Sequence, residues 1–155
     1  GGVDFVTGCD LRYVTDSATF KIHETAIGLM ADVGTLQRLP KQIPEAILKE
    51  MAFSSRALTA QEAKHFGFAN DLYKDIKDLY QGVDAVSKSI AIHSPMVLWG
   101  TKKAIHFQRH NRVEDGLDRA ALWNSALMSH QDVMRSLESY STKKQAKYDP
   151  IKPEK

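Results

Sequence analysis

The chain has 155 residues, a length that predicts one domain or part of one. Hydrophobic residues make up 43% and charged residues 26%, which are ordinary values for a soluble globular protein. The formal net charge of +2 gives no basis for nucleic-acid binding, no apolar run approaches the roughly 20 residues of a membrane-spanning helix, and the single cysteine, Cys9, excludes an internal disulfide.

The first third of the chain predicts short elements. β-Branched and aromatic residues indicate two strands, with a turn at Asp16 and Ser17 between them. Pro40 is expected to end the last of these elements, because proline has no backbone N–H with which to continue a helix. In chain order the elements are a short buried helix at 1–10, strands at 11–15 and 18–22, a loop at 24–34 and a short helix at 34–40.

From Pro44 onward the sequence predicts mainly helices. Thr59 and Glu62 have the spacing of a capping box, and Gly67 marks the end of that helix. A brief strand is expected at 69–73. Helices are expected at 44–53, 58–68, 75–94 and 94–111, followed by 113–129 and 130–143 as two helices or as one bent helix.

The predicted strands lie near the start of the chain and are too few to form a stable sheet by themselves. The apolar faces of the first helix and strands therefore need another surface to cover them. We expect that a preceding segment supplies a sheet for this purpose.

Three acidic residues have unusually apolar or glycine-rich surroundings: Asp4, Glu24 and Asp32. The first N–H groups of a helix have no partner within the helix and can bind an oxyanion, and a glycine there lets a ligand approach the backbone. Gly1 and Asp4 are three residues apart, so they fall on the same helix face. The sequence therefore predicts an oxyanion donor with a carboxylate beside it.

Glu24 follows the second predicted strand directly, and Asp32 lies in the next loop. Carboxylates in a dry pocket have raised pKa values and can carry protons near neutral pH. Two of them directed at different carbons of one substrate suit a proton shuttle. The spacing alone leaves a plainer alternative open, in which Glu24 is a helix cap and Asp32 belongs to a loop turn.

For the other reactive side chains, the sequence favours a structural role over a functional one. His106 and His110 are four residues apart on a predicted helix, but no third ligand accompanies them, so we expect a solvated helix face and no metal site. Cys9 has neither a nearby histidine nor a second cysteine, and we expect a small buried residue there.

Four stretches of the chain carry a family resemblance. They are GGVDFVTGCDLRY, FKIHETAIGLMADVGTLQRLP, MAFSSRALTAQEAKHFGFAND and HSPMVLWGTKKAI. All four resemble segments of the enoyl-CoA hydratase/isomerase (crotonase) superfamily, and the second most resembles its Δ3,5-Δ2,4-dienoyl-CoA isomerases. The resemblance implies the α/β class with a crotonase-like ββα spiral, here mostly its helical C-terminal portion with two or three short strands.

The resemblance also implies an organisation in three parts. Residues 1–75 correspond to the C-terminal part of the crotonase core and carry the acidic residues. Residues 76–145 correspond to a helical trimerisation region, in which Trp99, Trp123 and Met128 are spaced for core or interface packing. Residues 146–155 are expected to form a disordered tail.

Four residues match functional positions of the family. Gly1 matches the glycine whose N–H is one of two oxyanion donors to the thioester, and Asp4 matches the first acidic position. Hydratases typically have glutamate there, so aspartate departs from the hydratases and agrees with the dienoyl-CoA isomerases. Glu24 matches the second acidic position, and Asp32 matches the acid characteristic of dienoyl-CoA isomerases.

These matches imply an isomerase that shifts the double bonds of 3,5-dienoyl-CoA to give 2,4-dienoyl-CoA in the β-oxidation of unsaturated fatty acids. Asp32 is expected to remove a proton next to the thioester carbonyl and Glu24 to deliver one at the far end of the conjugated system. No metal or redox cofactor is implied, because the coenzyme A thioester itself acidifies the α-proton. The family further implies an acyl-CoA substrate, a homotrimer or dimer of trimers, and a peroxisomal or mitochondrial location.

Two alternatives remain open at this point. One is a Δ3-Δ2-enoyl-CoA isomerase or an enoyl-CoA hydratase. The other alternative arises because the family places the second oxyanion donor and most of the acyl-CoA pocket in its N-terminal half. The chain then corresponds to the C-terminal half of the enzyme, and the alternative is an inactive subunit that acts as an oligomerisation module.

Overall fold

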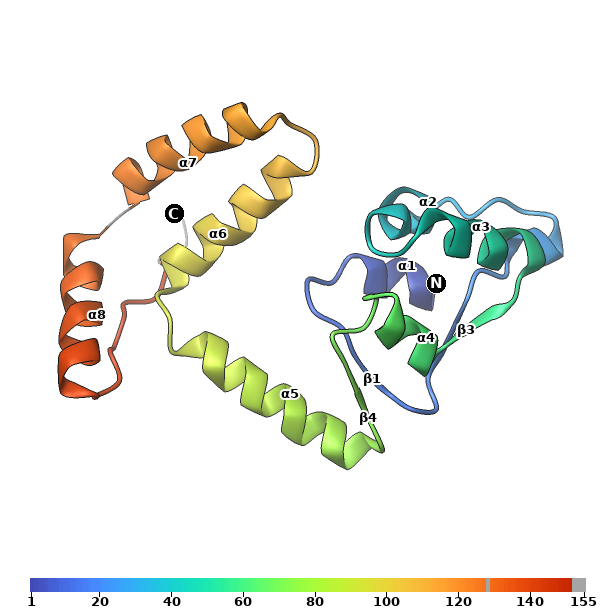
Figure 1. The fold of residues 1–155 in the computed structure, drawn as a ribbon, viewed down its shortest axis with the longest axis horizontal. Coiled ribbons are helices and arrows are strands. Elements are labelled where there is room, and N and C mark those ends of the chain that lie inside the picture. The colour runs from blue at the N-terminus through green and yellow to red at the C-terminus, as the bar shows by residue number, and fades with distance from the viewer. Residues whose placement is uncertain (128, 152–155) are drawn as a thin grey trace. The chain divides into compact units, whose positions relative to one another are not determined.

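A computed structural model describes residues 1–127 and 129–151 of the chain, which form two compact units. The first unit comprises Gly1–Asp84 and the second begins at Ala85, within helix α5 (Ile76–Ala91). Figure 1 labels most of their elements. The expected functional division at residues 75 and 145 stays a prediction. Met128 and residues 152–155, which belong to the expected packing set and tail, lie outside the described residues.

The short elements of the first unit follow the predicted order. They are α1 (Gly2–Thr7), β1 (Tyr13–Thr15), β2 (Thr19–Lys21), η1 (Glu24–Ile27), α2 (Thr35–Arg38), η2 (Leu39–Lys41), α3 (Glu45–Ser54), β3 (Ala57–Thr59), α4 (Ala60–His65) and β4 (Asp71–Tyr73). One expectation was wrong in detail, because the predicted loop at 24–34 begins with the 3₁₀ helix η1. Helix α2 ends at Arg38, just before Pro40, as expected, and Pro40 lies in the first turn of the separate 3₁₀ helix η2, where its missing N–H costs nothing.

The four strands pair with distant partners. Strand β1 is parallel to β4, with Val14 opposite Leu72, and β2 is antiparallel to β3, with Phe20 opposite Leu58. The turn after β1 therefore does not make a hairpin with β2. Each pair has only two strands of three residues, so its stability depends on the helices packed against it.

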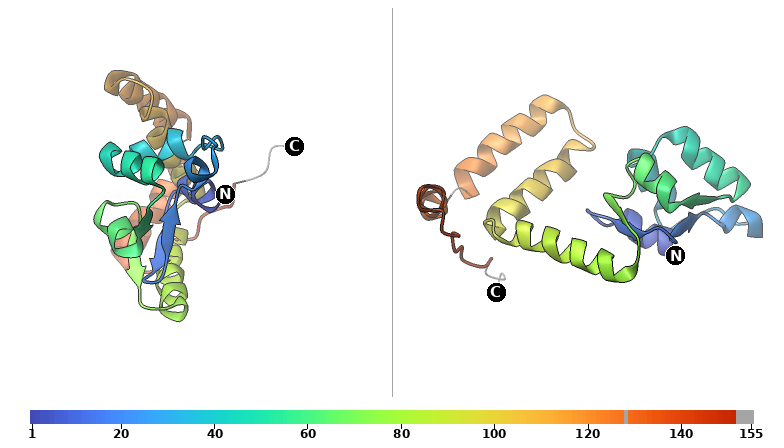
Figure 2. Two further views of the ribbon diagram at one scale, coloured as in Figure 1. Left: turned by 90° about the vertical axis from the view of Figure 1, so that its right-hand side faces the viewer. Right: turned by 60° about the horizontal axis from the view of Figure 1, so that its bottom comes forward.

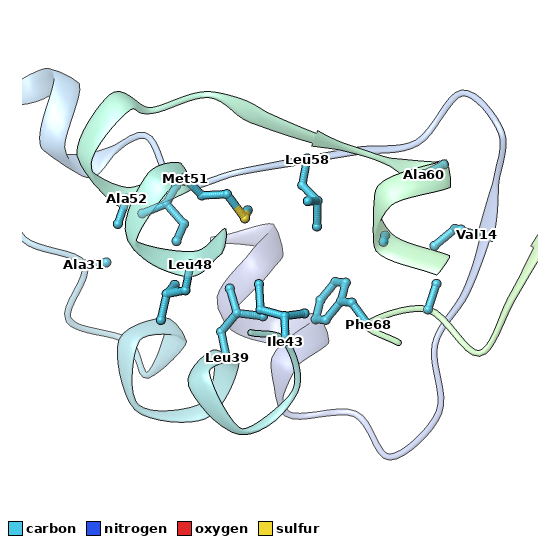
Figure 3. Close-up of a cluster of buried hydrophobic side chains, with 13 residues drawn as sticks. Val14, Ala31, Leu39, Ile43, Leu48, Met51, Ala52, Leu58, Ala60 and Phe68 are labelled. Carbon is cyan, nitrogen blue, oxygen red and sulfur yellow. The ribbon is translucent and has the colours of Figure 1, made fainter. Parts of the chain in front are cut away.

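The hydrophobic core lies in the first unit. Its largest fully buried side chains are Phe68, Leu39, Met51 and Leu58, which Figure 3 shows gathered with their neighbours between the helices and the chain segments around them. The ring of Phe20 on β2 meets Phe68 edge to face, with centroids 5.0 Å apart. This core fixes β2, and with it the position at which Glu24 follows.

The predicted capping box of α4 is confirmed. Thr59 Oγ1 accepts a hydrogen bond from the Glu62 N–H at 3.2 Å, and Glu62 Oε2 accepts one from the Thr59 N–H at 2.8 Å. Gly67 follows the helix with a φ of +77°, which glycine adopts readily.

Beyond α5, the elements of the described part of the second unit are helices. Helices α6 (Pro95–Gln108) and α7 (Val113–Leu127) lie side by side in the views of Figures 1 and 2, and the rings of Trp99 and Trp123 stack between them at 5.4 Å. Ser129 then has an extended backbone and caps α8 (His130–Thr142) by accepting from the Asp132 N–H. The residues from 113 onward therefore form two helices and not one bent helix.

Helices α5, α6 and α8 bury none of their residues. Large apolar side chains remain exposed on all three and on α7, including Ile76, Ile105, Leu122 and Leu137. Within the described residues, no helix combines the length and the apolar character needed to cross a bilayer.

Candidate active site

Asp4 is a buried carboxylate on the short helix α1, with only 7% of its surface exposed. Its Oδ1 accepts two hydrogen bonds from Thr35, one from the hydroxyl at 2.6 Å and one from the backbone N–H at 3.1 Å. Its Oδ2 lies 3.6 Å from the amino nitrogen of Gly1. Thr35 is the first residue of α2, so its N–H has no partner within that helix and is available to Asp4.

The hydrogen bond from the Thr35 hydroxyl lowers the pKa of Asp4 below its ordinary value, and burial acts in the opposite direction. The Thr35 N–H also lowers this pKa. Because the hydrogen bonds outweigh desolvation, Asp4 is a carboxylate at neutral pH. It is therefore a fixed negative charge and not a proton carrier.

A cavity of about 330 Å³ brings together three of the four predicted site residues. Gly1, Asp4 and Glu24 all line it, together with residues of β2 such as Phe20 and Lys21. Glu24 is half-buried and begins η1, three residues after β2 ends. The strand thus brings one carboxylate to the cavity and α1 brings the other.

Asp32 is placed differently. It is exposed and does not line this cavity. It lies in the connection between Gly28 and Gly34, both of which have positive φ values, +77° and +105°. The neighbouring Met30 is 75% exposed and Val33 is 66% exposed. The structure therefore joins Asp4 and Glu24 in one cavity and presents Asp32 on an adjoining apolar loop.

Sequence reasoning missed two residues that support this site, Thr35 and Arg38. Arg38 Nη2 donates to the Asp4 carbonyl at 2.8 Å, and Arg38 Nε donates to Thr7 Oγ1 at 3.1 Å. Both residues lie in the GTLQRLP stretch, and their contacts with Asp4 and Thr7 join residues at least 31 positions apart, so no local spacing links them. One general rule could have pointed to them: a buried aspartate needs hydrogen-bond donors, and hydroxyl and guanidinium groups are such donors.

The other reactive side chains do not line this cavity. Among the described residues, no three side chains of the histidine, cysteine and acidic types gather as metal ligands, so His106 and His110 belong to no such group. Cys9 is half-buried and is not paired in a disulfide.

The comparisons with known proteins agree on one family. The family model for enoyl-CoA hydratase/isomerase matches residues 1–150. The mitochondrial Delta(3,5)-Delta(2,4)-dienoyl-CoA isomerase of Mus musculus is 37% identical over 148 residues, which is 95% of this chain and 45% of that protein. The peroxisomal Delta(3,5)-Delta(2,4)-dienoyl-CoA isomerase of Arabidopsis thaliana is 35% identical over 148 residues, or 96% of this chain and 53% of that protein.

The fold also occurs in solved structures. The crystal structure of enoyl-CoA hydratase from Mycobacterium tuberculosis superposes with a TM-score of 0.89 at 24% identity, covering 96% of this chain and 59% of that one. The predicted α/β crotonase-like fold is thereby confirmed. The chain spans about half the length of the curated relatives that it matches. From the match over nearly its whole length, the chain belongs to the enoyl-CoA hydratase/isomerase family.

Proposed function

We propose that this chain carries the acid–base residues of a dienoyl-CoA isomerase, which converts a 3,5-dienoyl-CoA into a 2,4-dienoyl-CoA during the oxidation of unsaturated fatty acids. The observation that carries the proposal is the cavity in which Asp4 and Glu24 meet. An aspartate at the first of these positions is the feature by which the chain resembles dienoyl-CoA isomerases and departs from hydratases. The relatives with that name match 95–96% of the chain, which supports the same assignment.

In this proposal the thioester oxygen binds at the N-terminus of α1. Gly1 lines the cavity beside Asp4, and its N–H is one donor to the oxyanion. Preorganised donors of this kind stabilise the negative charge that develops when a proton leaves the carbon next to the carbonyl, and each is worth about 10²–10³ in rate.

Two carboxyl groups move the protons. The Asp32 carboxylate removes a proton from C-2 and the electrons spread over the conjugated system as a dienolate. The protonated Glu24 then delivers its proton to C-6, and the double bonds come to rest at C-2 and C-4. Each turnover leaves Asp32 protonated and Glu24 ionised, so both exchange a proton with solvent before the next one. Asp4 stays ionised throughout as the fixed charge beside Glu24.

The proposal includes no metal or redox cofactor. The reaction moves protons and double bonds without a net oxidation, and the thioester supplies the acidity of the α-proton. The substrate is an acyl-CoA. A mitochondrial or peroxisomal location is part of the proposal, and it is supported by relatives that are named for these two compartments.

A homo-oligomer, either a trimer or a dimer of trimers, is also proposed. It is supported by the apolar side chains that α5 to α8 leave exposed, since single molecules rarely expose large apolar patches. Size-exclusion chromatography with light scattering tests this part. We expect three or six times the mass of one chain, and a monomer would contradict it.

Steady-state kinetics test the reaction. We expect this chain to convert a 3,5-dienoyl-CoA and to hydrate a 2-enoyl-CoA far more slowly. Comparable hydration would favour the hydratase, and conversion of only a 3-enoyl-CoA would favour the Δ3-Δ2-enoyl-CoA isomerase. Oligomerisation without any turnover would identify the chain as an oligomerisation module.

A further inference from the structure

Arg38 joins two segments that carry acids of the candidate site. Its Nη2 donates to the Asp4 carbonyl in α1 at 2.8 Å and to the Val33 carbonyl, next to Asp32, at 2.9 Å. Its Nε donates to the Thr7 hydroxyl at 3.1 Å, and that hydroxyl in turn donates to the Asp4 carbonyl at 2.8 Å. One side chain therefore fixes the backbone at Asp4 and the backbone beside Asp32.

These bonds need the shape of a guanidinium. Nε and Nη2 point along one edge of the planar group and reach acceptors on different segments at the same time, which a lysine ammonium on its flexible stem does not reproduce. Within residues 1–127 and 129–151, no carboxylate pairs with Arg38. Its hydrogen bonds go to neutral oxygens of α1 and the loop, so the side chain acts as a cross-link between segments and not as one half of an ion pair.

Gly34 gives independent support for this arrangement. Its φ is +105°, and a Cβ added there would overlap the Arg38 guanidinium. The turn that ends the Asp32 loop thus leaves room for the guanidinium against its backbone. A side chain at position 34 would both strain the turn and push Arg38 away from its acceptors.

We propose that Arg38 is a positioning residue, which holds the loop carrying Asp32 in register with the helix carrying Asp4. The inference rests on the proposed function, in which Asp32 and Glu24 act on the two ends of one conjugated system. Asp32 is exposed, and its loop makes few buried contacts of its own. Ala31, directly before Asp32, is buried in the core, and Arg38 adds a second anchor on the other side of Asp32, so that the base and the cavity keep a fixed separation.

The test compares Arg38→Lys with a matched control, Arg56→Lys. Arg56 is also a bridging arginine of the first unit, and it bonds Glu50 and Glu62 away from the cavity. Two backbone amides report on the two sites by site-resolved hydrogen exchange. The Thr35 amide donates to Asp4 and reports on the Arg38 link, whereas the Glu62 amide donates to Thr59 and reports on the Arg56 link.

We expect Arg38→Lys to speed exchange at Thr35 about tenfold and to leave Glu62 unchanged, and Arg56→Lys to do the reverse. With 3,5-dienoyl-CoA as substrate, Arg38→Lys should lower kcat by roughly 10²-fold and change KM by less than about threefold, because the reacting groups are misplaced while binding is retained. Arg56→Lys should leave both constants unchanged.

Three results would overturn the inference: unchanged exchange at Thr35, equal acceleration at Thr35 and Glu62, or a loosened Thr35 with unchanged kcat. If Arg38→Lys does not fold, Thr7→Val removes the hydroxyl that accepts from Arg38 Nε and leaves the turn at Gly34 unstrained, and the same three results would overturn the inference. If the wild-type chain does not turn over the dienoyl-CoA, the proposed function fails. Exchange at Thr35 then still decides whether Arg38 holds the loop.

Discussion

Replacing Thr35 with valine tests how the buried carboxylate of Asp4 is held. Valine keeps the shape of threonine and the backbone N–H, but it removes the hydroxyl that lies 2.6 Å from Asp4 Oδ1. Thr35 and Asp4 are 2% and 7% exposed, so water does not readily replace the lost donor. A hydrogen bond to a charged group contributes about 1.5–3 kcal/mol, and we expect the first unit to lose about 2 kcal/mol at pH 7.

The pH dependence of this loss follows from the pKa of Asp4. The Thr35 hydroxyl holds that pKa below its ordinary value of 3.8. A carboxyl group whose pKa is lower in the folded state adds stability above its unfolded-state pKa, and that stability disappears as the pH falls through the folded-state pKa. The difference in unfolding free energy between wild type and Thr35→Val should therefore have its full value at pH 5–7 and shrink below pH 3.8.

Hydrogen exchange at the Ala69 amide measures this loss of stability in the first unit. Tryptophan fluorescence is not used, since both tryptophans lie in the second unit. The Ala69 N–H donates to the Ala63 carbonyl at 2.9 Å within the buried core. A loss of about 2 kcal/mol corresponds to roughly 30-fold faster exchange. Thr25→Val, at an exposed position, is the control. An equal ratio of variant to wild-type exchange rates at pH 7 and below pH 3.8 would refute the reasoning, because the effect would then not depend on the charge of Asp4.

Three further predictions concern the cap, the core and the proposed base. Thr59→Ala removes the hydroxyl of the capping box and should cost about 1 kcal/mol in urea unfolding, whereas Thr59→Ser should cost much less. Phe68→Ala removes a ring that is 1% exposed and should destabilise the first unit by about 3–5 kcal/mol, which Ala69 exchange would report; a cost below about 1 kcal/mol would contradict the assigned core. Asp32→Asn should lower kcat strongly with little change in KM in dienoyl-CoA kinetics, and a near-normal kcat would exclude Asp32 as an acid–base residue.

Local chemistry made several elements predictable. The Thr59–Glu62 capping box and the positive φ of Gly67 depend on residues a few positions apart, so their pattern is visible in the sequence. The two short strands near Asp16 were predicted for the same reason. Their partners were not, because β1 and β4 are separated by more than 50 residues and three-residue strands carry almost no register information.

The site was predicted only in part. The glycine-rich start of α1 and its one acid pointed to Gly1 and Asp4, and the end of β2 pointed to Glu24, all of which line one cavity. The exposed position of Asp32 and the donors Thr35 and Arg38 did not follow from any local pattern. These features depend on how α2 packs against α1, which is a tertiary contact between segments 31 or more residues apart.

The central claim is that two different carboxyl groups move the proton, and isotope labelling tests it most directly. In the proposed mechanism Glu24 exchanges its proton with solvent before each turnover, so in D₂O the 2,4-dienoyl-CoA formed from a 3,5-dienoyl-CoA should carry one deuterium at C-6. Glu24→Gln should abolish the reaction. A product that retains the original C-2 proton at C-6 would show that one group carries the proton between the two carbons, and it would contradict the account.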